Sequence, residues 1–171
     1  TGSIASQSRI SNALIKFADQ GGTVIGICNG FQILTELKLL PGTLVRNKNL
    51  KFICKDINLK VNKNSRFTNL YNNNEVIRIP IAHAEGNYYT DKKTLKKLKD
   101  NDQIIFSYCN ENGDITKESN PNGSLLNIAG ITNKKGNVIG LMPHPERVSE
   151  KVFNNTDGIK FFKSVVNYHN Y

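Results

Sequence analysis

Cys28 stands in a stretch whose residue types could perform nucleophilic chemistry. The run Thr-Val-Ile-Gly-Ile-Cys-Asn-Gly-Phe-Gln at 23–32 places one glycine two residues before the cysteine and another two residues after it. This spacing is the thiol counterpart of a nucleophile elbow, in which small neighbours allow a strained turn to lift the nucleophile to the edge of a sheet. A helix that begins directly after Cys28 would favour its thiolate. A buried structural cysteine at the end of a strand is the alternative that the spacing leaves open.

Two histidines with neighbouring carboxylates could serve such a nucleophile. His144 and Glu146 are separated by one residue in Pro-His-Pro-Glu-Arg, and residues i and i+2 of an extended chain point to the same side. A carboxylate beside an imidazole orients it and supports its charged form, which would complete a Cys-His-acid triad. His83 and Glu85 have the same spacing, and the residues alone do not decide which pair serves Cys28. Metal binding by these side chains is disfavoured, because neither pair has the i, i+4 spacing of a zinc-binding helix.

Helices and strands that alternate along the chain must position these residues. The apolar patterns predict helices over 10–18, 31–40 and 91–100, a last helix from about 157, and strands over 23–28, 75–82, 103–108, 125–131 and 138–142. Residues 50–61 are expected to form a strand or a bent pair of strands. Pro80 indicates an edge or a strand end, and the polar segment 62–74 is expected on the surface. Cys28, His83 and His144 each follow an expected strand, where the sites of α/β sheets gather.

Length and composition are typical of a single domain that covers residues 1–171. With 38% hydrophobic residues the chain can bury a core, and none of its apolar runs approaches the roughly 20 residues of a membrane-spanning helix. The three separated cysteines indicate neither a disulfide framework nor a metal site, so we expect a reducing cytoplasm and interpret Cys54 and Cys109 as core residues.

The net charge of +9 raises the question of nucleic-acid binding. Eighteen of the 23 basic residues are lysines, spread along a chain that also holds 24 asparagines, and this pattern indicates a compositional bias. The densest group, at 91–100, carries Leu95 and Leu98 at helical spacing, so its lysines are expected to form the wet face of a helix. Stacking aromatic residues are missing there, and we expect no nucleic-acid partner.

Several motifs together resemble the class I glutamine amidotransferases, and more narrowly the family of glutaminase subunits of phosphoribosylformylglycinamidine synthase. They appear in the family's order between about residues 2 and 162, and they are Cys-Asn-Gly-Phe-Gln-Ile-Leu at 28–34, Arg-Asn-Lys at 46–48, Ala-His-Ala-Glu-Gly-Asn-Tyr-Tyr at 82–89, Asn-Pro-Asn-Gly-Ser at 120–124 and Met-Pro-His-Pro-Glu-Arg at 142–147. The resemblance implies a three-layer, flavodoxin-like α/β sheet covered by helices.

The resemblance also implies a role for each candidate residue. Cys28 would attack the side-chain amide of glutamine and form a thioester, while His144 moves the protons and Glu146 orients His144. The backbone N–H of Asn29 would stabilise the oxyanion. Gln32 matches a family position that helps to hold the glutamine substrate. By the same resemblance, His83 would lie near the substrate or a subunit interface.

The partners implied by the resemblance are subunits of the same enzyme. Ammonia released from glutamine would pass to a synthetase subunit that works in purine biosynthesis. A small accessory subunit would belong to the same assembly. ATP and magnesium would bind to the synthetase, and no cofactor is expected in this chain. Two alternatives stay open, namely another cysteine hydrolase or amidotransferase of the same fold, and a non-catalytic remnant that only binds a partner.

The family's members begin with strands, a helix and a glycine-rich loop that supplies a second oxyanion donor. Thr1 to Ala5 are similar to the residues that follow this loop, so we expect the N-terminal segment and its strands to be missing from this chain. Loss of one oxyanion donor costs about 3 to 4 kcal/mol of barrier, so little glutaminase activity is expected from the chain alone unless the missing segment is supplied.

Overall fold

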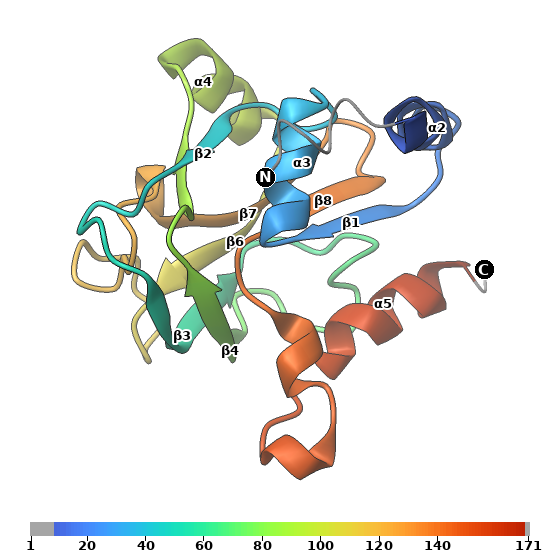
Figure 1. Ribbon diagram of the computed structural model, residues 1–171. Coiled ribbons are helices and arrows are strands. Elements are labelled where there is room, and N and C mark those ends of the chain that lie inside the picture. Colours follow the sequence, from blue (N-terminus) through green and yellow to red (C-terminus); the bar gives the residue numbers. More distant parts are fainter. Residues whose placement is uncertain (1–8, 170–171) are drawn as a thin grey trace.

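A six-stranded mixed sheet forms the centre of the computed structural model, which describes residues 9–169 (Figure 1). The strand order is β1-β8-β7-β6-β3-β4, and a separate pair, β2 and β5, forms a small sheet. The strands are β1 (Val24–Ile27), β2 (Thr43–Val45), β3 (Ile53–Val61), β4 (Val76–His83), β5 (Asn87–Tyr89), β6 (Ile104–Cys109), β7 (Ile128–Thr132) and β8 (Val138–Leu141). The helices are α2 (Arg9–Asp19), α3 (Asn29–Glu36), α4 (Lys92–Asp100) and α5 (Ile159–His169), with 3-10 turns η1 (Leu125–Asn127), η2 (Pro145–Val148) and η3 (Lys151–Phe153).

Helices cover both faces of the sheet, which gives three layers. Figure 1 shows α3 and α5 on opposite sides of it. On one side Phe31 and Leu34 of α3 belong to an apolar cluster with Met142. On the other side Phe161 of α5 packs against Phe106, with ring centroids 6.2 Å apart. The predicted α/β sheet covered by helices is confirmed.

Strand direction decides which strand ends meet. In the described sheet β1 and β8 run parallel, with Ile27 paired to Leu141, while the other neighbouring strands run antiparallel. Parallel neighbours end at the same edge, so the residues that follow β1 and β8 are brought together. β4 lies at the far edge of the sheet, as Pro80 predicted.

Most predicted elements are present, with two differences near the elbow. The helix after Cys28 ends at Glu36 rather than before Pro41, because Leu37 caps it and Lys38 adopts a φ of 61°. The pair β2 and β5 was not predicted, since strands of three residues are too short to show an alternating pattern.

Two predictions about burial were wrong. Cys54 is exposed, because the first half of β3 presents its side chains to the surface. The segment 62–74 lies only partly on the surface: Phe67 is fully buried and stacks on Phe161 of α5 at 6.2 Å. Cys109 is buried, as expected.

Helix α2 has the predicted position but a different buried face. Ile10 is 73% exposed and Phe17 is 51% exposed, whereas Ala18 is buried. Ala18 joins the apolar cluster on the α3 side of the sheet, and Leu14 packs against that cluster. The expectation about Thr1 to Ala5 falls outside the described residues. None of the helices between residues 9 and 169 combines the length and apolarity that crossing a bilayer requires.

Candidate active site

Cys28 occupies a sharp turn between β1 and α3. Its backbone has φ 52° and ψ −106°, outside the regions that side-chain-bearing residues favour, and it is the N-cap of α3. A Cβ on Gly26 would lie 2.7 Å from the carbonyl of Gly30, so only glycine allows this approach of strand and helix. A Cβ on Gly30 would meet no atom within 4 Å. The predicted elbow is confirmed, but packing requires only the first of its two glycines.

His144 and Glu146 form the hydrogen-bonded pair that their spacing predicted. His144 Nδ1 lies 2.6 Å from Glu146 Oε1, and because a carboxylate accepts, the nitrogen donates. The other ring nitrogen, Nε2, is buried and has no hydrogen-bond partner among the described residues. In the neutral ring this nitrogen carries the lone pair, so His144 is prepared to accept a proton there.

The parallel pair of strands brings Cys28 and His144 to one edge of the sheet. The N–H of Cys28 donates to Leu141 O at 2.8 Å, which ties the elbow to the end of β8. The N–H of His144 donates to Pro80 O at 2.9 Å, and Cys28 Sγ lies 3.8 Å from Ala82 O, so both residues also meet the end of β4.

The electrostatic surroundings keep Cys28 protonated at rest. Burial raises the pKa of its thiol above the ordinary value; the N–H of Asn29 and the charge of Arg147 lower it, and Glu146 raises it again. The sequence predicted that the helix terminus would favour the thiolate. That effect is present through Asn29, but desolvation outweighs it, so attack by Cys28 requires a base.

His83 is held by a different partner than Glu85. Asn47 Oδ1 accepts the N–H of Gly86 at 3.0 Å, which identifies it as the amide oxygen, and His83 Nδ1 lies 3.1 Å from the same atom. His83 Nδ1 therefore donates. Glu85 is exposed and makes no hydrogen bond with His83 in the described structure.

The ring of His83 is consequently a neutral acceptor. Burial, with a smaller contribution from the charge of His144, lowers the pKa of His83 to about 4. Its Nε2 is buried and lacks a partner within residues 9–169. Of the two histidine–carboxylate pairs, only the one formed by His144 and Glu146 has the geometry of a base with an orienting acid.

Asn29 and Gln32 lie on α3 beside the thiol. The backbone N–H of Asn29 faces the sulfur of Cys28. Gln32 follows one helical turn later, is partly buried, and donates its N–H to Cys28 O at 3.3 Å.

The sequence did not predict that Asn47 is fully buried and holds His83 by a hydrogen bond, because one asparagine among 24 gives no signal of burial.

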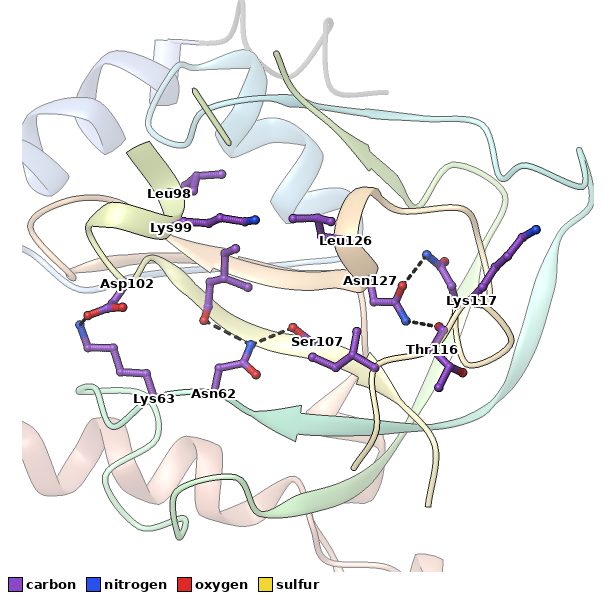
Figure 2. A pocket seen from close by; sticks show the side chains of 13 residues that line it. Asn62, Lys63, Leu98, Lys99, Asp102, Ser107, Thr116, Lys117, Leu126 and Asn127 are labelled. Carbon is purple, nitrogen blue, oxygen red and sulfur yellow. Dashed lines mark hydrogen bonds and ion pairs between the residues drawn. The ribbon is translucent and has the colours of Figure 1, made fainter. Parts of the chain in front are cut away.

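A cavity of about 680 Å³ lies elsewhere in the fold, between β6, α4 and η1. Figure 2 shows Asn62 directed at Ser107 and Asn127 directed at Thr116 on its walls, with hydrogen bonds of 2.8 Å and 2.7 Å. None of the candidate residues lines it. Residues 9–169 contain no group of three His, Cys, Asp or Glu side chains that could hold a metal ion.

Comparison with known proteins places these residues in a family. The profile of the CobB/CobQ-like glutamine amidotransferase domain matches residues 1–169. A phosphoribosylformylglycinamidine synthase subunit PurQ of Koribacter versatilis is 54% identical, over 97% of this chain and 72% of its own length. The counterpart of Pyrococcus horikoshii is 52% identical, over 96% of this chain and 72% of its own length.

Solved structures agree with the sequence comparison. A chain in the structure of PurLQS from Thermotoga maritima superposes with a TM-score of 0.84 and 41% identity, covering 98% of this chain and 71% of that one. A putative GMP synthase subunit of Thermoplasma acidophilum, with a TM-score of 0.55 and 15% identity over 93% of this chain and 65% of its own, shares the fold. The chain belongs to the CobB/CobQ-like glutamine amidotransferase family.

Proposed function

We propose that Cys28, His144 and Glu146 hydrolyse the side-chain amide of glutamine. The chain acts as a glutaminase subunit of phosphoribosylformylglycinamidine synthase in purine biosynthesis, since relatives named as subunit PurQ of that synthase are 51% to 54% identical over nearly its whole length. The observation that carries the residue assignment is the His144–Glu146 pair of 2.6 Å, which leaves a buried Nε2 without a partner among residues 9–169, at the strand edge that Cys28 shares.

The first half of the reaction forms a thioester. His144 Nε2 takes the proton of the Cys28 thiol, and the sulfur attacks the carboxamide carbon of glutamine. The C–S bond forms while the carbonyl π electrons move to oxygen. The negative charge of Glu146 stabilises the imidazolium. When the tetrahedral intermediate collapses, the C–N bond breaks and the nitrogen takes the proton from His144, so ammonia leaves.

The second half of the reaction hydrolyses the thioester and releases glutamate, with His144 again moving the proton. Water loses a proton to His144 Nε2 and attacks the thioester carbon. The C–S bond then breaks, and the proton returns to the sulfur of Cys28. Because the pKa of the Cys28 thiol is raised at rest, the protonated thiol is a suitable end state of the cycle.

Three neighbours are assigned to the substrate. The N–H of Asn29 opens α3 and faces the sulfur of Cys28, so it suits the oxyanion. The side chain of Gln32, one turn further on, is assigned to hold glutamine through its amide. Nε2 of His83, which has no partner in the part of the chain that the structure describes, is assigned to accept a hydrogen bond from the substrate.

The product determines what kind of partner the chain needs. Ammonia released into water is protonated and diffuses away, so productive transfer requires a sheltered route to a docked synthetase. We assign ATP and magnesium to that synthetase, and include a small accessory subunit in the assembly. The exposed free thiol of Cys54 is compatible with a reducing cytoplasm, which we propose as the location.

The test measures ammonia release from glutamine by the chain reconstituted with its synthetase and small subunits. Cys28→Ala should abolish release, whereas Cys54→Ser, at an exposed cysteine, should leave the rate unchanged. Release that persists in the Cys28→Ala variant would overturn the assignment.

A further inference from the structure

The cavity between β6, α4 and η1 has the size of a small-molecule site. Its volume is about 680 Å³, and ligand pockets in proteins measure roughly 300 to 1,000 Å³. The residues that line it are spread between positions 62 and 127, so several segments of the fold build it together. None of the residues assigned to glutamine hydrolysis lines it. A molecule bound here would be a second ligand of the chain.

The charged side chains of the lining favour an anion. Lys63, Lys99 and Lys117 contribute three ammonium groups, and Asp102 is the one carboxylate among the described lining residues. Asp102 Oδ2 lies 3.8 Å from Lys63 Nζ. Lys99 and Lys117 make no ion pair with the residues that the structure describes. The remaining excess of two positive charges matches a phosphate monoester, which carries about −1.5 to −2 charges at pH 7.

Apolar side chains form another part of the lining. Leu126 is 47% exposed and Ile115 is 48% exposed, and both border the cavity. Leu98 adds apolar surface from α4. Figure 2 shows the side chain of Lys99 extending from α4 toward Leu126 of η1. A free inorganic anion would leave this apolar surface in contact with water, so the lining fits an anion that is joined to a larger, partly apolar body.

The turn η1 holds Leu126 at the cavity in a strained backbone conformation. Leu126 has φ 51° and ψ 33°, and Asn127 has φ 57°. The side-chain nitrogen of Asn127 fixes the turn by donating to Thr116 O at 2.7 Å and to Tyr108 O at 3.0 Å. A leucine in the left-handed region is rare, and such strain gathers at ligand sites.

Asn62 and Ser107 offer a neighbouring acceptor and donor on the wall. The side-chain nitrogen of Asn62 donates to Ser107 Oγ at 2.8 Å and to Ile104 O at 3.4 Å, which identifies the amide nitrogen. Asn62 Oδ1 and the hydroxyl proton of the buried Ser107 have no hydrogen-bond partner within residues 9–169. An adjacent donor and acceptor match the edge of a nucleobase, as in the N6 amino group and N7 of adenine.

We propose that this cavity binds a nucleoside monophosphate. The base packs against Leu126, and its edge meets Ser107 and Asn62. The phosphate lies beside the ammonium groups of Lys99 and Lys117. The proposal goes beyond glutamine hydrolysis and does not depend on it, since it concerns residues that the hydrolysis does not use. An acidic segment of a partner protein is the competing occupant.

The experiment is a calorimetric titration of AMP, GMP, CMP and UMP, each in turn, into the full chain at about 0.15 M salt, where long-range attraction between charges is screened. At least one nucleotide should bind with saturation at a single site. The matching nucleoside, and inorganic phosphate, should each bind about tenfold more weakly or less, because each lacks one half of the contacts.

Two lysine variants locate the anion. K99Q/K117Q should weaken binding of the nucleotide by about tenfold or more, because it removes the charge-assisted contacts with the phosphate. K92Q/K93Q removes the same net charge from exposed lysines of α4 that do not line the cavity, and it should bind like the wild type. Equal weakening by both variants would show attraction to the overall charge and would overturn the site.

Leu126→Asn tests the apolar contact. Asparagine tolerates the left-handed backbone of this position, so the variant should fold, and binding should weaken about fivefold or more. In NMR spectra of the wild type, the N–H signals of Ser107 and Asn127 should shift when the nucleotide is added.

Three results would overturn the proposal. One is the absence of saturable binding by all four nucleotides, and another is inorganic phosphate that binds as tightly as the best of them. The third is nucleotide binding that leaves the signals of Ser107 and Asn127 unchanged. If no nucleotide binds but K99Q/K117Q weakens assembly with the synthetase or the small subunit, the cavity belongs to the competing occupant, an acidic segment of that partner.

Discussion

At the scale of single residues, the site depends on two nitrogen atoms that the fold leaves unpaired. Nε2 of His144 and Nε2 of His83 are both buried without partners in the described residues, although buried polar atoms are normally hydrogen-bonded. Each ring is fixed through its other nitrogen, by Glu146 or by Asn47. The carboxylate makes one imidazole a base, and the neutral amide leaves the other an acceptor.

Glu146→Gln tests the carboxylate that orients His144. The amide can replace the hydrogen bond but not the charge that stabilises the imidazolium, so kcat for glutamine hydrolysis should fall by about 10²- to 10⁴-fold. The Glu146 side chain is 42% exposed, so the melting temperature should change little. A kcat within about threefold of wild type would exclude this role for Glu146.

The neutral state of His83 should appear in the pH dependence of stability. Folded His83 has a pKa of about 4, whereas the unfolded side chain titrates near 6.5, so the unfolded chain binds more protons between these values. The contribution of His83 is complete above pH 6.5 and is lost as the pH falls toward 4. It amounts to about 3 kcal/mol.

Urea unfolding at a series of pH values measures this dependence. The difference in unfolding free energy between wild type and His83→Asn should shrink as the pH falls from 6.5 to 4, because the variant lacks the titrating group. Parallel pH profiles for the two proteins would show that His83 is not held neutral.

At the scale of elements, the elbow depends on the close approach of β1 and α3. The sequence predicted a strand, a turn and a helix from the spacing of two glycines, and all three are present at the predicted place. It could not assign separate roles to the glycines, since both look alike in sequence. Gly26 faces the backbone of Gly30, whereas Gly30 faces open space.

Gly26→Ala and Gly30→Ala form a matched pair. At Gly26 the added Cβ would lie 2.7 Å from the Gly30 carbonyl, so the strand and helix must shift and the unfolding free energy should fall by about 1 to 3 kcal/mol. At Gly30 it should stay equal or rise by up to about 1 kcal/mol, because alanine favours the helix and meets no neighbour. Chemical denaturation of both variants checks the contrast, and equal losses would contradict it.

At the scale of the whole molecule, the sequence predicted the layers and the edge that holds the site, but not the surroundings of that edge. Cys28 and His144 could be placed together because each follows an apolar strand, and the structure pairs those strands in parallel. The contacts between Asn47 and His83 join segments 36 residues apart, and no local pattern reports such a pairing. The prediction that the helix terminus favours the Cys28 thiolate did not include desolvation, and burial raises the pKa of that thiol.

Exposure and burial could be predicted from the sequence only where local spacing determines them. The lysines of α4 form its wet face, as Leu95 and Leu98 at helical spacing predicted. Cys54 and Phe67 were misplaced because their exposure depends on which distant elements cover β3 and the following segment. Local periodicity predicts that an element forms, whereas the tertiary arrangement determines which of its faces is covered, as Ile10 and Phe17 of α2 show.

The most direct test of the account is the mass of Cys28 after reaction with an electrophilic analogue of glutamine. In the assembled enzyme, peptide mass spectrometry should find the adduct on Cys28, with little at Cys54 or Cys109, and excess glutamine should prevent it. His144→Ala should slow its formation. An adduct that forms elsewhere, or one on Cys28 that glutamine does not prevent, would contradict the assignment of Cys28 as the nucleophile of a glutaminase.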